Sequence, residues 1–188
     1  MRLLIFFGLI LGLSLDTQAQ IKPGLSVQIY PAGQIVQASA RVWSNERSEA
    51  TIFAGINRAR RQDFGKKDNE EGLGGGIGID IMRLTGTRPR GLYLGGKLDL
   101  WYLNIDWRQV ENPCPKGAQC LAPVILRTGE TRIFVVQPTV IAGYRLLPVG
   151  NSVTVDFSIA LGVEINAYTD GDRVGEGVIL LGGLALGF

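Results

Sequence analysis

The last part of the chain alternates apolar and polar residues without a break. From residue 153 to residue 168, the apolar positions are Val153, Val155, Phe157, Ile159, Leu161, Val163, Ile165 and Ala167. Between them stand Thr154, Asp156, Ser158, Ala160, Gly162, Glu164, Asn166 and Tyr168. A period of two places the two sets on opposite faces of a β-strand. A polar turn follows, and a second apolar strand returns to the last residue, Phe188.

The same alternation recurs along the chain and predicts eight strands. We expect them at about residues 24–30, 35–43, 49–60, 73–84, 91–107, 131–146, 153–168 and 178–188. The second, fourth and sixth connections are short, whereas the third, fifth and seventh are long or charged; the first connection, which is also short, is an exception. Transmembrane barrels have short turns at one end and longer loops at the other. The sequence therefore predicts an all-β fold, an eight-stranded antiparallel transmembrane β-barrel over residues 22–188, with both termini in the periplasm.

Two strands depart from the simple pattern. In the fifth strand, the leucines up to Leu100 alternate with charged residues, but from Leu103 onward the apolar residues occupy the other phase. One extra residue switches the phase of a strand, so we expect a β-bulge near Trp101 or Tyr102. In the sixth strand, Pro138 lacks the N–H that a ladder hydrogen bond needs. We expect a local bulge there as well.

The composition of the polar set indicates which face of the barrel meets lipid. This set carries Gly, Ser, Ala and Asn rather than the Lys and Glu of a solvated surface. Small residues fit a narrow lumen, so the apolar set is expected to face lipid. Phe188, Tyr144 and Trp107 are then expected near the interfaces, as girdle residues. The alternative is a soluble lipocalin-like barrel, with its polar face outward and a ligand in an apolar lumen.

The N-terminus and the cysteines indicate export. Residues 1–19 combine a positive Arg2, an apolar stretch too short to span a bilayer, and a small-residue cleavage site. This is the pattern of a secretory signal peptide, so the barrel domain would occupy residues 20–188. Cys114 and Cys120 lie in one predicted outer loop, and we expect them to form a disulfide in an oxidising compartment. The net charge of +2 is too small to suggest a nucleic-acid partner.

The C-terminus resembles the assembly signal of outer-membrane barrels. Phe188 is the aromatic last residue, Leu186 is hydrophobic, and Gly183 stands sixth from the end, whereas Leu181 replaces the usual polar residue. With eight strands and a signal peptide, the chain resembles the small eight-stranded outer-membrane β-barrels of Gram-negative bacteria, the OmpA/OmpX-like class. The resemblance implies the barrel-assembly machinery, outer-membrane lipid and lipopolysaccharide as partners, and we expect a monomer.

Three further segments refine this resemblance. Residues 22–33, 59–65 and 174–178 are similar to segments of an uncharacterised subgroup known only as outer-membrane β-barrel proteins. Membership of that subgroup implies a location but no activity. We expect no appended peptidoglycan-binding domain.

Seven charged residues fall on the polar face of the predicted barrel. They are Arg41, Asp80, Lys97, Asp99, Arg145, Asp156 and Glu164. Eight-stranded barrels are just wide enough for side chains to fill them, so we expect cross-strand ion pairs that close the lumen. The short turns predict Arg145 opposite Thr154, with Asp156 diagonal to it. They also predict Asp80 diagonal to Lys97. The alternative use of these charges is a path for protons or small ions.

Candidate catalytic chemistry is sparse. The Gly-rich run at residues 72–78 lacks both the spacing and the following helix of a nucleotide-binding loop. The chain has no His, and a hydroxyl nucleophile needs an adjacent base. A metal site is also unfavoured without His and with paired cysteines. We therefore expect no catalysis, no cofactor and no metal.

Three arginines stand at the top of the third strand. Arg58, Arg60 and Arg61 are candidates for bidentate contacts with lipopolysaccharide phosphates, and the alternative is an ordinary solvated rim. The sequence as a whole predicts a structural, envelope-integrity or surface-interaction role. A narrow channel for small solutes and a soluble ligand-binding barrel remain the alternative functions.

Overall fold

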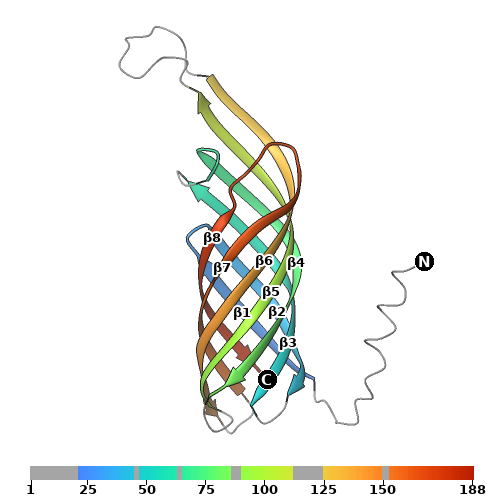
Figure 1. Ribbon diagram of the computed structural model, residues 1–188, viewed down its shortest axis with the longest axis vertical. Coiled ribbons are helices and arrows are strands. Elements are labelled where there is room, and N and C mark those ends of the chain that lie inside the picture. Colours follow the sequence, from blue (N-terminus) through green and yellow to red (C-terminus); the bar gives the residue numbers. More distant parts are fainter. Residues whose placement is uncertain (1–20, 45–46, 63–64, 86–89, 112–124, 150–152) are drawn as a thin grey trace, which may run out of the picture.

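The alternating segments form eight antiparallel strands in a computed structural model that describes residues 21–44, 47–62, 65–85, 90–111, 125–149 and 153–188. Each strand pairs with its sequence neighbours, and β1 pairs with β8 to close the barrel (Figure 1). The strands are β1 (Lys22–Tyr30), β2 (Gly33–Ser44), β3 (Ser48–Gln62), β4 (Asn69–Leu84), β5 (Gly91–Glu111), β6 (Ile125–Val149), β7 (Val153–Asp170) and β8 (Gly177–Gly187). The predicted eight-stranded barrel is confirmed. Among the described residues, no helix has the length and apolar character needed to cross a bilayer.

The two ends of the barrel differ in their connections. The start of β1 lies beside the end of β8, where Gly24 pairs with Gly187. The β2–β3, β4–β5 and β6–β7 connections lie at the same end, which we call the terminal end (Figure 1). The β3–β4, β5–β6 and β7–β8 connections lie at the opposite end, which we call the loop end.

An apolar belt surrounds the outer face of the barrel wall. Its members include Leu25, Val27, Ile56, Ile77, Ile79, Leu92, Leu98, Val140, Ile159, Leu161, Leu180 and Leu184, all of them exposed. Along β5 the belt runs from Leu92 to Tyr102, which corresponds to about 33 Å of extended strand. At a tilt of about 40°, this length spans about 25 Å, the height of the apolar band that transmembrane barrels present to lipid.

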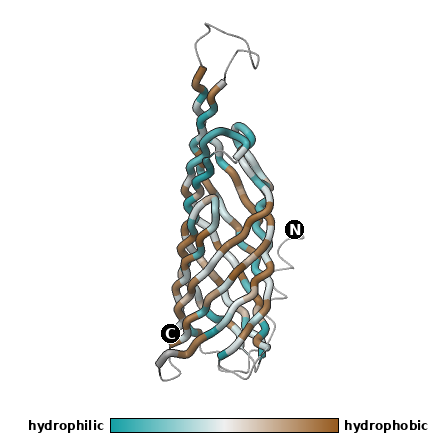
Figure 2. The backbone as a smooth tube through the Cα atoms, turned by 90° about the vertical axis from the view of Figure 1, so that its left-hand side faces the viewer, coloured by the Kyte–Doolittle hydropathy of each residue, from teal (hydrophilic) through white to brown (hydrophobic). Residues whose placement is uncertain are grey.

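The phase change in β5 marks a change of surroundings rather than a bulge. The pairing of β5 with β4 and with β6 runs in one register throughout, so the bulge predicted near Trp101 or Tyr102 is wrong. From Trp101 to Trp107 the inward side chains are apolar and buried, whereas Asn104 and Asp106 face outward. The strand thus leaves the apolar belt and continues into a part of the barrel where its outward residues, Asn104 and Asp106, are polar. Hydrophilic residues are frequent at this end of the chain trace (Figure 2).

The loop-end half of the barrel therefore has an apolar interior. Its fully buried side chains include Ile35, Trp101, Leu103, Ile105, Ile133, Val135 and Val174. The Gly-rich part of β4 makes room for them, because a Cβ added at Gly76 would collide with the ring of Trp101. The glycines of this run that face inward are the small lumen residues that the sequence predicted. Truncating a buried Trp of this kind costs about 3–5 kcal/mol.

A β-bulge in β7 does occur, but at a place that the sequence did not indicate. Phe134 pairs with Tyr168 and Val135 pairs with Asn166, so Ala167 is the extra residue. The bulge turns Tyr168 outward, away from the polar face on which the alternation had placed it. An aromatic row lies at the upper edge of the belt, the edge nearer the loop end. In this row Phe134 pairs with Tyr168 on one side and with Tyr102 on the other.

The predicted girdle residues divide into two groups. Phe188 and Tyr144 are exposed on the outer face, as expected. Trp107 is buried inside the barrel near the loop end, so its assignment to the girdle is wrong. Its indole Nε1 donates to Thr131 Oγ1 at 3.2 Å, and Lys67 Nζ lies 4.0 Å from its ring centroid.

Pro138 lies where the β6–β7 ladder is interrupted. On β5 it pairs with Leu98 in unbroken register. Towards β7, pairing stops after Val136 and resumes at Thr139 in the same register. The bulge predicted at Pro138 is therefore wrong, and the missing N–H is accommodated by a gap in the ladder.

Candidate functional site

The inward charges of the barrel form three groups along its axis. The terminal-end cluster is Arg41, Glu49, Arg145 and Asp156, the middle pair is Lys97 and Asp99, and the loop-end cluster is Arg61, Glu70 and Glu164. All seven charges that the sequence placed in the lumen do face inward, with Asp80 between the first two groups. Glu49, Arg61 and Glu70 were missing from that set.

Arg145 organises the terminal-end cluster. Its Nε and Nη2 donate to the two carboxylate oxygens of Asp156 at 2.7 and 2.8 Å, and its Nη1 donates to Glu49 Oε2 at 2.7 Å. Arg41 Nε lies 3.1 Å from the same oxygen of Glu49, as a charge contact rather than an aligned hydrogen bond. Two guanidinium groups are thus matched by two carboxylates.

The partner of Arg145 follows from a register shift. The β6–β7 pairing shifts between Leu146 and Val149, so Arg145 stands directly opposite Asp156. The predicted register, with Thr154 opposite Arg145, is wrong by two residues. The two charged side chains meet all the same, because direct opposition brings them even closer than a diagonal arrangement.

Lys97 and Asp99 form the middle pair. Lys97 Nζ lies 3.0 Å from Asp99 Oδ2, donates to Gln37 Oε1 at 2.8 Å, and stands 4.6 Å from the ring centroid of Phe53. Gln37 Nε2 donates to Asp99 Oδ1 at 3.1 Å. Asp80 is directly opposite Lys97 in the ladder, not diagonal to it as predicted, and the ammonium pairs with Asp99 instead.

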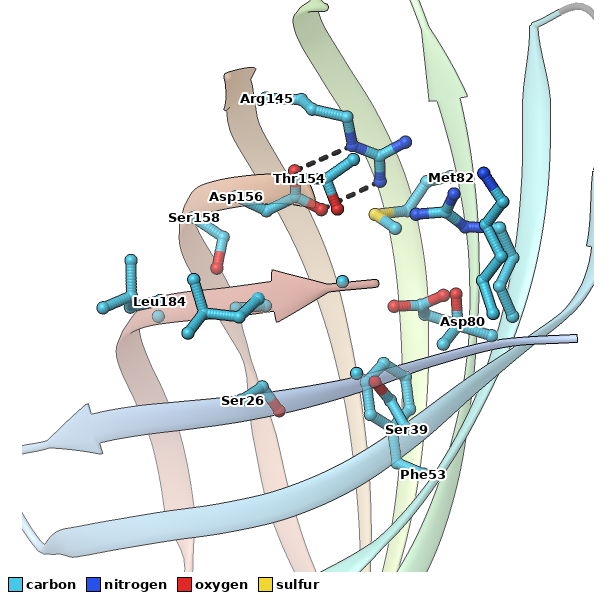
Figure 3. Close-up of a pocket in the computed structure, with 18 of the residues that line it drawn as sticks. Ser26, Ser39, Phe53, Asp80, Met82, Arg145, Thr154, Asp156, Ser158 and Leu184 are labelled. Carbon is cyan, nitrogen blue, oxygen red and sulfur yellow. Dashed lines mark hydrogen bonds and ion pairs between the residues drawn. The ribbon is translucent and has the colours of Figure 1, made fainter. Parts of the chain in front are cut away.

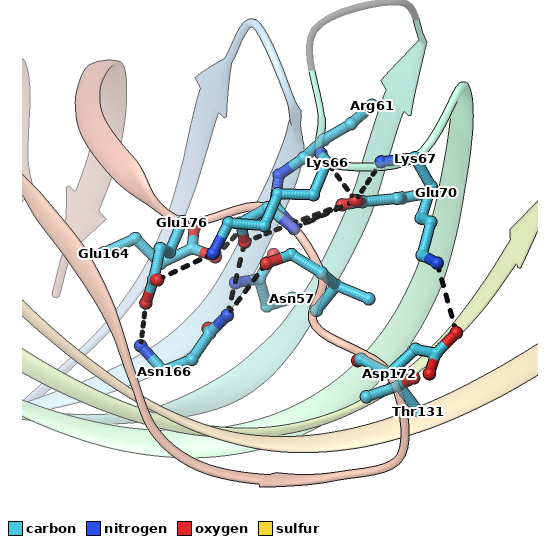
Figure 4. Close-up of polar contacts among 12 residues, drawn as sticks. Asn57, Arg61, Lys66, Lys67, Glu70, Thr131, Glu164, Asn166, Asp172 and Glu176 are labelled. Carbon is cyan, nitrogen blue, oxygen red and sulfur yellow. Dashed lines mark hydrogen bonds and ion pairs between the residues drawn. The ribbon is translucent and has the colours of Figure 1, made fainter. Parts of the chain in front are cut away.

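Arg61 lies at the centre of the loop-end cluster. Its Nη1 donates to Glu70 Oε2 at 3.1 Å and to the carbonyl of Gly175 at 2.9 Å, and its Nη2 pairs with Glu164 (Figure 4). Glu70 also accepts the backbone N–H groups of Lys66 and Lys67 at 3.0 and 3.1 Å. Buried carboxylates with several donors of this kind hold loops in one conformation.

The β7–β8 connection closes over the loop-end mouth of the barrel. We call residues 171–176 the strap. Val174 of the strap is fully buried in the apolar interior, and Gly175 contacts both Arg61 and Glu70. Asp172 lies 3.1 Å from Lys67 Nζ. The strap is therefore fastened to β3 and to the loop between β3 and β4.

Glu176 ends the strap on the outside. Lys66 Nζ lies 3.0 Å from its Oε1, and the backbone N–H of Asn166 donates to its Oε2 at 3.2 Å. The hydrogen bond from Lys66 is the main cause that lowers the pKa of the Glu176 carboxyl below its ordinary value, and the Asn166 N–H adds to it.

The three arginines of β3 do not act together. Arg58 and Arg60 are exposed on the outer face, just beyond the apolar belt, and Arg58 Nη2 lies 3.1 Å from Glu71 Oε1. Arg61 is buried inside the barrel, so it is not on the surface that the sequence assigned to it. A strand alternates its faces, and three arginines at positions 58, 60 and 61 cannot share one.

The terminal-end half of the lumen contains a cavity of about 70 Å³. Hydroxyl groups and Asp80 line one part of it, and Arg41, Arg145 and Asp156 of the terminal-end cluster line another (Figure 3). The lining extends to Lys22 and Phe188, at the start of β1 and just after β8. Among the described residues, no group of three or more His, Cys, Asp or Glu side chains has the geometry to hold a metal ion.

The structure describes the C-terminal motif but not the predicted disulfide or signal peptide. Leu186 and Phe188 of the C-terminal motif face outward, and Gly183 faces inward, where a Cβ would collide with Ser158 Oγ. Cys114, Cys120 and the predicted signal peptide lie outside the described residues. The disulfide therefore stays a prediction.

The comparisons with known proteins concern the fold. No protein-family model and no curated protein matches the sequence. Among solved structures, Neisserial surface protein A superposes with a TM-score of 0.51 and 11% identity, over 89% of this chain and 94% of that one. The chain has the fold of the small eight-stranded outer-membrane β-barrels.

Two further structures are similar at lower scores. The N-terminal barrel domain of Pseudomonas aeruginosa OprF gives a TM-score of 0.47 and 10% identity, over 91% of this chain and 98% of that domain. Ail, the attachment invasion locus protein of Yersinia pestis, gives a TM-score of 0.40 and 11% identity, over 88% of this chain and 94% of that one.

Proposed function

We propose that this protein is an integral outer-membrane β-barrel with a structural or surface-interaction role and no catalysis. The observation that carries the proposal is the contrast between the lumen and the loop end. Buried ion pairs and the strap fill the lumen, whereas the β5–β6 hairpin extends beyond the other strands (Figure 1). A closed lumen supports a role on the surface rather than transport.

In this proposal the terminal end lies in the periplasm and the loop end lies outside the cell. The height of the apolar belt and the aromatic row at its upper edge support this placement. Residues 1–19 serve as the signal peptide, and Gly183, Leu186 and Phe188 serve as the assembly signal for the barrel-assembly machinery. The barrel acts as a monomer.

The protruding hairpin is the surface that we assign to interaction. The β6 strand meets β7 only from Arg132 onward, so residues 125–131 pair with β5 alone. Val110 is opposite Leu126 near the end of this ribbon, and both are exposed, as is Ile125. A free strand edge with exposed apolar side chains is a template for binding another chain.

Cells that display the protein provide the test of this assignment. We would compare the full-length chain with a variant in which a short turn replaces residues 109–129, using panels of immobilised host and bacterial surface molecules. The proposal expects the variant to assemble as a heat-modifiable barrel and to lose binding. Equal binding by both proteins would contradict a role for the hairpin.

Arg58 and Arg60 are proposed to contact lipopolysaccharide phosphates at the upper edge of the belt. Guanidinium groups bind phosphate oxygens in a bidentate manner, which supports this assignment over a merely solvated rim. The paired change Arg58→Gln and Arg60→Gln should weaken the thermal stabilisation of the purified barrel by lipopolysaccharide. Arg83→Gln, on the outer face of β4 near the terminal end, is the matched control and should leave it unchanged.

Planar-bilayer recording tests the closed lumen directly. We expect the wild-type barrel to conduct poorly, because side chains fill eight-stranded barrels and each buried charge is held by a partner or by hydrogen bonds. A large and stable single-channel conductance would favour the narrow channel over the structural role.

A further inference from the structure

The charges inside the terminal-end half of the barrel do not balance. Its inward cations are Arg41, Lys97 and Arg145, and its inward carboxylates are Glu49, Asp80, Asp99 and Asp156. The two arginines are matched by Glu49 and Asp156, and Lys97 is matched by Asp99. Within the part of the chain that the structure describes, Asp80 is the carboxylate left without an ion-pair partner.

Asp80 and Ser26 are buried polar residues with unused hydrogen-bonding atoms. Asp80 is 4% exposed and Ser26 is 6% exposed, and neither Asp80 Oδ1 nor Ser26 Oγ has a hydrogen-bond partner among the described residues. Both residues line the cavity of about 70 Å³, as do Ser39 and Thr51 (Figure 3). Thr51 is directly opposite Asp80 on β3.

A carboxylate in such a place is costly unless something compensates its charge. A buried ion without a partner either takes up a proton or binds an opposite charge. The nearest cation along the ladder, Lys97, directs its ammonium to Asp99, Gln37 and the Phe53 ring. Arg41 and Arg145 line the same cavity, but their guanidinium groups are directed to Glu49 and Asp156. Lys22 also lines it and is exposed.

The lining of the cavity fits a small hard cation. Carboxylate, hydroxyl and water oxygens are the ligands of such ions, and Asp80, Ser26, Ser39 and Thr51 supply the first two kinds. One uncompensated charge matches a monovalent ion, since calcium sites gather several carboxylates. A single water molecule needs about 10–15 Å³ of cavity volume, so a cavity of this size can hold an ion together with a few waters.

We propose that Asp80, together with the hydroxyl groups of Ser26, Ser39 and Thr51, forms a binding site for a small monovalent cation such as sodium or potassium. The ion enters from the terminal end of the barrel and stays there, because the apolar interior around Trp101 blocks the way to the loop end. The site gives the filled lumen a specific ion dependence that a purely structural barrel would lack.

The test uses the full-length barrel in detergent, with sodium, potassium or choline chloride at one total concentration and one pH. Replacing choline with sodium or potassium, from about 10 to about 300 mM, should raise the thermal unfolding midpoint, because a ligand of the folded state stabilises it. Asp80→Asn should abolish this increase. Asp106→Asn, which alters an outward carboxylate of β5, is the matched control and should keep it.

Ser26→Ala keeps the proposal testable if Asp80→Asn does not fold. It should raise the half-saturating cation concentration by up to about tenfold, the effect of one lost polar contact. Three results would overturn the proposal: equal midpoints in sodium, potassium and choline, an increase that persists in Asp80→Asn, or a response to divalent cations alone. The first of these would assign the compensating charge to a proton.

Discussion

The Glu70 carboxylate accepts the backbone N–H of Gly175 through both of its oxygens, at 2.9 Å each. The two residues are 105 positions apart in sequence, and their contact joins the start of β4 to the strap. Arg61 bridges the same two elements through Glu70 and the Gly175 carbonyl. The Glu70 carboxylate and the Arg61 guanidinium are thus the buried groups that hold the middle of the strap in place.

Glu70→Gln should release the strap. The amide accepts fewer and weaker hydrogen bonds than the carboxylate and no longer pairs with Arg61, so we expect the free energy of unfolding to fall by about 1.5–3 kcal/mol. Limited proteolysis should show faster cleavage at residues 171–176. Glu71→Gln is the matched control, because Glu71 is exposed and its pair with Arg58 should contribute less than about 1 kcal/mol. Equal effects of the two changes would contradict the role assigned to Glu70.

Arg145→Ala should destabilise the barrel far more than the removal of a surface arginine. It leaves Asp156 and Glu49 buried without their main partner, which costs about 3–5 kcal/mol. Arg132→Ala removes only an exposed contact, 3.7 Å from Glu130, and should change the free energy of unfolding by less than about 1 kcal/mol. Equilibrium unfolding in detergent with a denaturant measures both, and similar midpoints would refute the buried network.

The strap should loosen in acid. The pKa of Glu176 is lowered in the folded state, so its contribution to stability is present above its ordinary pKa and is lost as the pH falls through the folded value. The amide resonance of Asn166, which donates to Glu176, should titrate with a midpoint below that of an ordinary glutamate. Lys66→Ala should move this midpoint upward, and an unchanged midpoint would show that Lys66 does not stabilise the carboxylate.

Spin labels can locate the lipid face along β7. Ile159 is 64% exposed on the outer face, whereas Ser158 faces the lumen. A label at position 159 should respond to a lipid-soluble relaxation agent, and a label at position 158 should not. On β5, labels at Tyr102 and Asn104 should divide in the same way, because the apolar belt ends between them. The reverse response at either pair would require a different register.

Much of the barrel could be predicted because both faces of its strands are specified by alternation. The strand from Val153 onward shows this best, since every second side chain from Phe157 to Ile165 is exposed in the apolar belt. The order of short and long connections then determined which strand ends share one end of the barrel. Neither argument requires knowledge of the side-chain partners.

The register between neighbouring strands and the surroundings of each strand face could not be predicted from alternation. The register shift after Leu146 and the bulge at Ala167 depend on how neighbouring strands pair. The alternation within one strand does not specify that pairing. The phase of β5 was misread because an apolar side chain was assumed to face lipid everywhere. Above Tyr102 the surroundings are reversed, so the same residue type points inward.

The loop-end cluster was missed although the sequence contained a signal for part of it. Arg61 shares its phase with Asn57 and Ala59 rather than with Arg58, so alternation alone would have placed it inside. Glu49 shares its phase with Thr51 in the same manner. The role of Glu70 had no such signal, because its partners belong to two loops that meet only in the folded barrel.

The reversal along β5 also sets the depth at which the protein sits. Suppose that the strand slid by one residue against its neighbours. Lys97 would enter the hydrocarbon, and in the same step Leu103 would enter the water, so both halves of the strand would resist the movement. A strand whose outward residues were apolar along its whole length would incur only the first of these penalties, the entry of a polar side chain into the hydrocarbon. The two halves of β5 therefore fix the height of the barrel relative to the apolar belt, in addition to the aromatic row at the edge of that belt.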